Sequence, residues 1–428
     1  MSSKVRSTKV LFMSRCAALA VFLIPFISLP VLPSVYRPVS LYFLIPLFLI
    51  YSLNFKRLLL VSDIRVIILF LFCSLYGLVH AIFGTHASIV LYLSDLTVLC
   101  VGVVVYFGFR VVFLNLGIEG FVRYSNYAFK FLVFIGIAEI MSIVGVLPMD
   151  LKEGLNLLFS EKSQTRVQLT TMEASWGARV FLFSFLVYVC SAVDRYKVIY
   201  VLAGMMIFLF IFSIGVFAFA LLGLAMYCVY QYRLKGVGAL IALGCCVIAI
   251  IVLSVEIFSY FGFGGYHLSR ISALFSGDYY HISDMLTFDQ SIFIRVGYPI
   301  VAYQVGIDNP FGIGLGQYPL YFSQYLVDTF GSSVLSFPEV LDDVVSGDGD
   351  ARSLFLKVYS ELSFLGLILL FWMLFRSLRE RSESSYEKLK VLFFFMSIAS
   401  MLTIGTWAYL YFWIAIAMMP ASDKGELY

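Results

Sequence analysis

Long stretches of apolar residues, separated by short polar connections, recur along this chain. A helix needs about 20 apolar residues to cross a hydrocarbon core of roughly 30 Å, and a helix satisfies its own backbone polar groups there. The pattern therefore predicts eleven or twelve membrane-spanning helices. We place them at residues 10–29, 36–53, 63–83, 88–110, 121–147, 174–192, 195–212, 213–231, 236–256, 352–376 and 388–419.

Two of these stretches leave the number of helices open. Residues 195–231 form one very long run or two helices that join near Ser213, and residues 388–419 hold one helix or a tight pair. The composition also indicates a membrane protein: 61% of the 428 residues are hydrophobic, 13% are charged, and the mean hydropathy is +0.96. The expected fold class is therefore all-α, a polytopic membrane helical bundle.

Lysine and arginine gather in alternate connections, for example at Lys56 and Arg57, at Arg195, and at Arg379 and Arg381. By the positive-inside rule these connections and the N-terminus are cytoplasmic. The basic start resembles a secretory signal, but no small-residue cleavage site follows it. We therefore expect the first helix to be retained.

Two external connections are too long to be turns, residues 148–175 and residues 257–351. They divide the chain into an N-terminal bundle at 1–256, a large external loop at 257–351 and C-terminal helices at 352–428. The large loop has ten acidic residues and two arginines, a net charge of −8. This acidic balance argues against nucleic acid as a partner.

Within the large loop, residues 293–306 (FIRVGYPIVAYQVG) have helical apolar spacing. We expect this short amphipathic helix to lie along the membrane surface. The next stretch, DNPFGIGLGQY at 308–318, is rich in proline and glycine. It predicts a turn that brings its backbone close to another segment.

All seven cysteines lie in apolar runs, so no disulfide framework is expected, and neither the cysteines nor the four histidines have the spacing of a zinc site. The sequence gives no reason to expect a metal.

Arg166 and Arg295 are the first candidates for a binding site, because each stands in one of the external loops. A guanidinium group can hold phosphate through two parallel, charge-assisted hydrogen bonds. Each arginine is followed, after ten intervening residues, by a glycine, Gly177 and Gly306 respectively. The alternative is a solvated arginine or an ion pair with a nearby aspartate.

Two carboxylates are candidates for proton transfer. Glu173 stands just before a predicted helix start, where it either interacts with the helix dipole or accepts a proton from a sugar hydroxyl. Asp350 and Arg352 lie in GDGDARS at 347–353, just before a predicted helix. This stretch either caps that helix or contributes residues to a functional site. A metal-bound nucleotide sugar is excluded there, because nucleotide sugars are cytoplasmic and this loop is external.

Ionisable residues within predicted spans are functional candidates by default, because a charge at bilayer depth is costly. Lys357 and Glu361 are four residues apart and suit a local ion pair, and Lys130 suits a position near the cytoplasmic side. Asp95 and Glu139 could line a cavity. A transporter would depend on such residues.

Three stretches carry a resemblance to a known family: Arg166 with Glu173 and Gly177; IRVGYPIVAYQVGIDNPFGIGLGQY at 294–318; and ARSLFLKVYSELSFLGLILL at 351–370. In these stretches, and in its succession of helices and loops, the chain resembles the O-antigen polymerase (Wzy-type) family, within the O-antigen ligase and polymerase superfamily. The last stretch is similar to the family's E-x-G-xx-G helix, here Glu361, Ser363 and Gly366.

The chain departs from its superfamily at two places. Ligases carry a histidine followed by Asn, Ser or Gln at the head of the closing helix, where this chain has Arg352 and Ser353. The missing histidine favours polymerase over ligase. Many relatives also have Ser-Arg near residues 213–217, which here read SIGVF and contain no arginine.

The resemblance implies a GT-C-type glycosyltransferase of a bacterial inner membrane, with its large loops in the periplasm. It implies undecaprenyl-diphosphate-linked oligosaccharides as donor and acceptor, membrane lipid as surroundings, and no cofactor. In this scheme Arg166, Arg295 and Arg352 hold the diphosphate, Glu173 or Asp350 takes the proton, and Gly177, Gly306 and Arg270 support the site. It leaves open whether a chain-length-regulating membrane protein takes part. An O-antigen ligase and a lipid-linked sugar transporter stay as alternatives.

Overall fold

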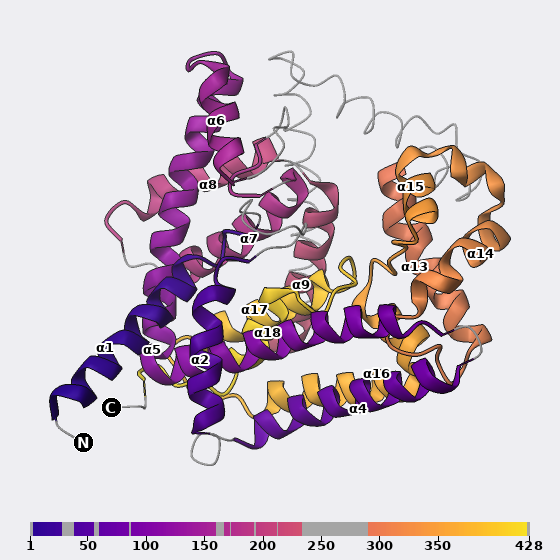
Figure 1. The fold of residues 1–428 in the computed structure, drawn as a ribbon. Coiled ribbons are helices and arrows are strands. Elements are labelled where there is room, and N and C mark those ends of the chain that lie inside the picture. Colours follow the sequence, from indigo (N-terminus) through magenta and orange to yellow (C-terminus); the bar gives the residue numbers. More distant parts are fainter. Residues whose placement is uncertain are drawn as a thin grey trace.

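The computed structural model describes residues 3–27, 38–54, 60–84, 87–159, 167–171, 173–191, 194–211, 213–232 and 290–425. Throughout these ranges the regular secondary structure is helical, as Figure 1 shows. The helices are α1 (Ser3–Phe22), α2 (Leu41–Leu53), α4 (Val61–Phe83), α5 (Ile89–Ile143), α6 (Met149–Phe159), α7 (Ala174–Ser191), α8 (Lys197–Ile211), α9 (Ile214–Tyr232), α13 (Gln290–Asp308), α14 (Tyr318–Phe330), the 3-10 helix η2 (Ser332–Ser336), α15 (Pro338–Ser346), α16 (Leu354–Arg379), α17 (Glu387–Ser400) and α18 (Leu410–Met418).

Five of the described helices, α4, α5, α7, α9 and α16, are long and apolar enough to cross a membrane. The apolar part of α1 and the whole of α2 and α8 are shorter. The described part of the chain is therefore all-α, and its long apolar helices indicate a protein embedded in a membrane. Fewer long helices appear than the predicted spans, because α2 and α8 are short, α5 joins two predicted spans, and residues 236–256 lie outside the described ranges.

The 55 residues of α5 contain a sharp bend at Gly117, where φ is 63° and ψ is −176°. A straight helix of that length would measure about 80 Å, far more than a bilayer core of roughly 30 Å. The bend separates the two predicted spans, 88–110 and 121–147. The C-terminal segment packs into it, because the amides of Ile118 and Glu119 donate to the carbonyls of Ser422 and Asp423.

Each of the two stretches whose helix number the sequence left open, 195–231 and 388–419, forms two helices. A break at Ser213 separates α8 from α9, and residues 401–409 separate α17 from α18. The second break matters for function, since the segment between α17 and α18 returns to the same end of the bundle as the start of α16: the amide of Leu354 donates to the carbonyl of Met401 at 2.9 Å. We call residues 401–409 the C-terminal loop.

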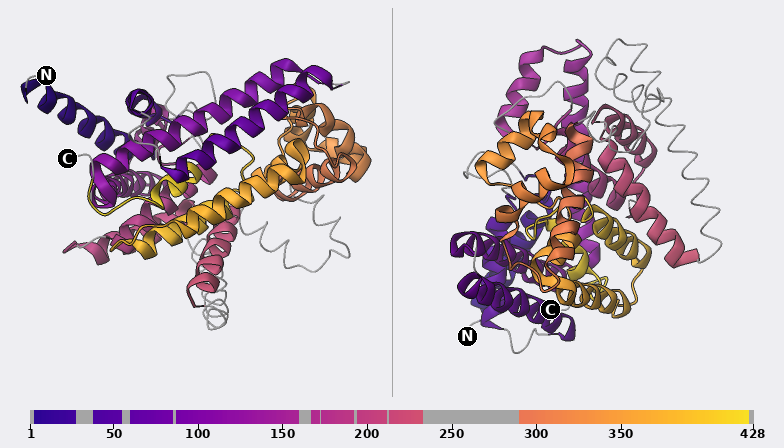
Figure 2. Two further views of the ribbon diagram at one scale, coloured as in Figure 1. Left: turned by 90° about the horizontal axis from the view of Figure 1, so that it is seen from below. Right: turned by 90° about the vertical axis from the view of Figure 1, so that its right-hand side faces the viewer.

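Helices α4, α16 and the first part of α5 run side by side, and α13, α14 and α15 gather at one end of this row (Figures 1 and 2). We call this second group, residues 290–350, the α13–α15 lobe. It has its own apolar core, which includes Phe293, Tyr298, Phe322 and Leu326. The predicted amphipathic helix 293–306 is confirmed as part of α13, whose buried face packs on this core and on α16. Its location at a membrane surface stays a prediction.

The glycine-rich turn of the lobe interlocks with a break in α16. Ser363 has φ 67° and ψ −176°, so the helix is interrupted there. The carbonyl of Ser360 accepts from the amide of Ile313 at 3.0 Å, and that of Glu361 accepts from the amide of Gly314 at 2.8 Å. A side chain at Gly312 would meet the backbone of Glu361 and Ser363. The predicted close approach of this turn to another segment is confirmed.

Four of the five ionisable residues that the sequence placed within spans have partners, whereas both carboxylate oxygens of Glu361 are buried without a hydrogen bond. Lys357 was expected to pair with Glu361, but its Nζ lies 2.8 Å from Oδ1 of Asp95 on α5. The expectation followed helical spacing, whereas the actual pair joins two helices that are distant in sequence. Lys130 pairs with Asp194. The Glu139 carboxylate accepts from the amides of Gln168 and Leu169, at 2.8 and 2.9 Å.

We predict that Ser363→Gly stabilises the protein, because a positive φ costs a non-glycine residue about 1–3 kcal/mol. The Ser363 hydroxyl accepts from the amide of Leu365 at 3.2 Å, but replacing such a cap by glycine costs only a few tenths of a kcal/mol. Thermal unfolding in detergent would show a higher midpoint for Ser363→Gly.

Ser360→Gly is the matched control for Ser363→Gly. Ser360 lies three residues earlier in α16 with helical backbone angles, where glycine lowers stability. Equal midpoint shifts in the two variants would contradict the strained backbone at Ser363.

Candidate functional site

Arg179 lies in the second turn of α7 and is the most enclosed arginine of the candidate site, with 7% of its surface exposed. The central carbon of its guanidinium group lies over the ring of Trp176, 5.1 Å from the ring centroid, and over that of Phe219 at 5.9 Å. One terminal nitrogen donates to the hydroxyl of Thr403 in the C-terminal loop at 3.2 Å. The Arg179 side chain is therefore held by three separate segments.

Arg295 of α13 reaches the same face of α9 as Arg179. Its Nε would lie 3.4 Å from a Cβ added to Gly215, and Phe219 stands one helical turn after Gly215. Arg295 is exposed and within electrostatic range of Arg179, as is Arg352. Guanidinium groups from α13 and from the segment before α16 thus both act electrostatically on the buried Arg179 of α7.

Arg352 is half-buried, and its backbone has an unusual positive φ of 50°. Its guanidinium lies 3.8 Å from Asp343 and 3.9 Å from Glu339, with the Tyr298 ring at 5.9 Å. Burial and the hydrogen bond from Tyr298 to Asp343 raise the pKa of Tyr298 far above its ordinary value. The tyrosine stays protonated, and Arg352 is held against the α13–α15 lobe by long, partly solvated ion pairs.

Glu173 directly precedes α7, as the sequence predicted, and its side chain is exposed. Its carboxylate accepts from the Ser175 hydroxyl at 3.0 Å and is within electrostatic range of Arg179. A side chain at Gly177 would meet the carbonyl of Gln168. Gly177 therefore allows residues 167–171 to pack closely on α7, and Glu139 holds the same residues from the other side.

Asp350 is half-buried and faces the C-terminal loop. A Cβ added to Gly405 would collide with both oxygens of its carboxylate. The same loop supplies Thr403, whose hydroxyl donates to Ser400 and accepts from Arg179. The C-terminal loop therefore contacts Asp350 and Arg179 at once.

The structure places four of the eight proposed site residues near Arg179 or the C-terminal loop. Glu173, Arg295 and Arg352 interact electrostatically with Arg179, and Asp350 reaches this region through the C-terminal loop. Gly306 has a packing role instead, because a side chain there would collide with the ring of Tyr359. Arg166 and Arg270 lie outside the described residues, although Arg166 directly precedes the segment 167–171 that packs on α7.

Sequence reasoning missed Arg179 and the C-terminal loop as parts of the site. A signal existed for Arg179, since an arginine within an apolar helix at bilayer depth is expensive and marks function. The C-terminal loop gave a weaker signal, because residues 401–409 interrupt the apolar run with only a few small polar residues and one glycine.

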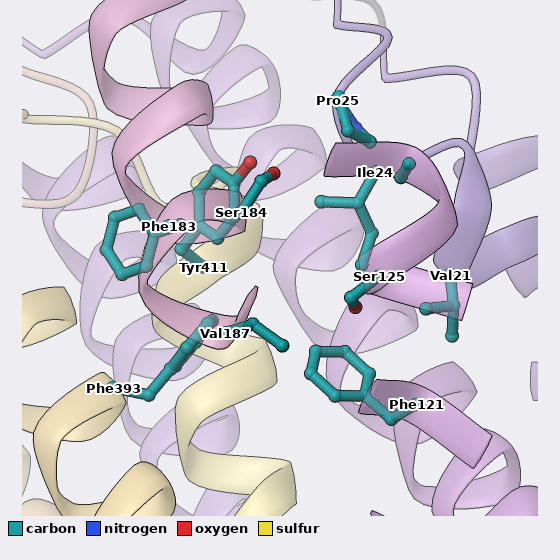
Figure 3. Close-up of a pocket in the computed structure, with 11 residues that line it drawn as sticks. Val21, Ile24, Pro25, Phe121, Ser125, Phe183, Ser184, Val187, Phe393 and Tyr411 are labelled. Carbon is teal, nitrogen blue, oxygen red and sulfur yellow. The ribbon is translucent and has the colours of Figure 1, made fainter. Parts of the chain in front are cut away.

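A small cavity lies elsewhere, between α1, α5, α7 and the α17–α18 pair (Figure 3). Its walls include Phe183, Phe393 and Tyr411, with the hydroxyls of Ser125 and Ser184 as polar groups. The Ser184 hydroxyl donates to the carbonyl of Val180 within its own helix. No charged side chain lines the cavity, so it is a packing gap separate from the candidate site.

No protein-family model matches the chain, and no curated protein or solved structure shows significant similarity to it. The resemblance to O-antigen polymerases therefore stays a prediction from particular residues. Over the described ranges, no group of three or more His, Cys, Asp or Glu side chains is arranged to hold a metal ion.

We predict that Gly405→Ala destabilises the protein by about 1–3 kcal/mol, the usual cost of overpacking. The added methyl group would collide with the Asp350 carboxylate. In an Asp350→Ala background the same substitution should cost much less, because neighbouring sites are coupled. Unfolding of the single and double variants in detergent measures this coupling.

Gly154→Ala is the control for Gly405→Ala, because an added Cβ meets nothing within 4 Å there. If Gly405→Ala lowered the free energy of unfolding equally with and without the Asp350 side chain, that result would contradict a contact between the C-terminal loop and Asp350.

Proposed function

We propose that this protein is an O-antigen-type polysaccharide polymerase that joins undecaprenyl-diphosphate-linked oligosaccharide units at the periplasmic face of a bacterial inner membrane. It is proposed to have a GT-C-type fold, with a cytoplasmic N-terminus. The observation that carries the proposal is that Arg295, Arg352 and Glu173 all lie within electrostatic range of the buried Arg179. These residues come from three segments that are far apart in the sequence.

The cluster suits a diphosphate better than a neutral or cationic substrate. Arginine binds phosphate oxygens through paired, charge-assisted hydrogen bonds, and a diphosphate offers several such oxygens. Arg179 has little exposed surface, so its charge is weakly screened by water. A substrate with two linked phosphates can contact more than one of the three arginines at once.

Two features of the fold support the family resemblance. The stretches that carry it, 294–318 and 351–370, interlock through the amides of Ile313 and Gly314. In addition, Ser363 stands where the family has glycine, and its φ of 67° is one that glycine adopts without strain. The backbone at this position therefore keeps a glycine-like shape even though the side chain differs.

In the proposed reaction a sugar hydroxyl oxygen of one lipid-linked unit attacks the anomeric carbon of the growing chain. The new glycosidic bond forms as the bond from that carbon to the lipid diphosphate breaks. Arginines neutralise the charge that develops on the departing diphosphate, which stabilises the transition state. The hydroxyl proton passes to a carboxylate, and Glu173 is assigned this role, with Asp350 as the second candidate.

The buried ionisable residues do not favour a transporter. Lys357 pairs with Asp95, Lys130 pairs with Asp194, and Glu139 accepts two backbone amides. These contacts tie helices and loops together. Among the described residues, these three sets of contacts therefore serve packing rather than a continuous polar path for a sugar.

We predict that Arg166→Ala and Arg295→Ala each reduce chain elongation at least about a hundredfold, by removing charge from the leaving diphosphate. The assay is elongation by purified protein given only lipid-diphosphate-linked repeat units, resolved as a ladder on a gel. Arg195→Ala is the control, because Arg195 is an exposed arginine beside Tyr196 at the other end of α7.

Wild-type levels of elongation in both Arg166→Ala and Arg295→Ala would contradict a diphosphate clamp. Failure of the wild type to elongate its cognate unit would reject the polymerase. Transfer of finished glycan to a lipid A core acceptor would then identify a ligase.

We also predict that Glu173→Gln lowers the elongation rate about a hundredfold or more, the usual contribution of a general base. The amide keeps the size of the side chain but cannot accept the proton. Glu153→Gln is the control, because Glu153 is an exposed residue of α6. Full activity in Glu173→Gln together with loss of activity in Asp350→Asn would assign the proton acceptor to Asp350.

A further inference from the structure

Arg179 lacks the partners that a buried charge normally has. In the described part of the chain no carboxylate lies within ion-pair distance of it, and its Nε is buried without a hydrogen-bond acceptor. Glu173 interacts with it only at longer range, while Arg295 and Arg352 repel it. An unpaired buried cation is costly, so this arrangement is stable only if something offsets the charge.

Two aromatic rings and one hydroxyl group surround the guanidinium group of Arg179, and its Nε has no hydrogen-bond partner. Trp176 and Phe219 lie 5.1 and 5.9 Å from its central carbon, and aromatic rings interact with the flat faces of such a group. The Thr403 hydroxyl accepts a hydrogen bond from one terminal nitrogen of Arg179. The remaining N–H groups point along the plane of the guanidinium, where a phosphate group accepts two parallel hydrogen bonds.

The three arginines of the cluster differ in how firmly they are held. Arg295 is exposed on α13, and Arg352 forms long ion pairs with Glu339 and Asp343. Only Arg179 is both enclosed and fixed by aromatic side chains from two helices. Its guanidinium is therefore already oriented before any ligand arrives, which lowers the entropic cost of binding.

We propose that Arg179 is a further diphosphate-binding residue, and that it provides the fixed contact against which the phosphates of the substrate dock. The identity of the anion rests on the proposed function, but the presence of an anion site at Arg179 rests on its own contacts. Arg295 and Arg352 then close on the same anion from the α13–α15 lobe and from the segment before α16. Thr403 is a positioning residue that fixes the rotation of the guanidinium.

The test is binding of farnesyl diphosphate and farnesyl monophosphate to the purified full-length protein, measured by titration calorimetry in detergent. Arg179→Lys keeps the positive charge but removes the planar pair of donors. We expect it to weaken farnesyl diphosphate binding about tenfold or more, and farnesyl monophosphate binding about twofold. Arg195→Lys, which changes an exposed arginine at the other end of α7, should bind both ligands as the wild type does.

The comparison of the two ligands separates binding from structural support. A residue that only supports the fold would lower the affinity for both ligands equally and would lower the unfolding midpoint, and that result overturns the inference. Arg179→Lys and Arg179→Gln that both bind farnesyl diphosphate within twofold of the wild type would overturn it as well. Thr403→Val should weaken diphosphate binding less than Arg179→Lys does.

The same variants distinguish this inference from the proposed function. If farnesyl diphosphate binding depends on Arg179 but the wild type never elongates a lipid-linked unit, the anion site stands and the polymerase fails. If the wild type elongates and Arg179→Lys gives a full ladder, the polymerase stands and the role of Arg179 fails.

Discussion

The interlock between the glycine-rich turn and the break in α16 is the contact on which the site depends. An uninterrupted helix would use the carbonyls of Ser360 and Glu361 for its own hydrogen bonds. Because the backbone turns at Ser363, these carbonyls accept the amides of Ile313 and Gly314 instead. The α13–α15 lobe is thereby attached to the membrane bundle through main-chain hydrogen bonds, and Arg295 is placed near the start of α16.

The site then forms where several chain segments end, and not inside a single helix. Arg179 comes from the start of α7, Arg352 from just before α16, and Thr403 from the break between α17 and α18. Helix ends and breaks leave backbone groups available and admit polar side chains at a depth where a continuous helix would be apolar. Aromatic rings beside Arg179 shield its charge from water and so strengthen its attraction for an anion.

Sequence patterns predicted the parts of the site that depend on local order. The amphipathic spacing of 293–306 gave the helix that carries Arg295, and the glycines of 308–318 gave a turn with close backbone contacts. Glu173 was placed correctly just before a helix. The pairing of Lys357 was predicted wrongly, because spacing within one helix says nothing about Asp95, which lies 262 residues away.

The sequence by itself determined the helical membrane class, most helix positions and the candidate arginines, because apolar run length and local spacing control these features directly. Only the tertiary structure decided that Arg179 joins Arg295 and Arg352, that residues 401–409 contact Asp350, and that Lys357 pairs with Asp95. Each of these contacts joins segments far apart in the chain. Their formation depends on how bent helices pack together, and no local pattern of residues encodes that packing.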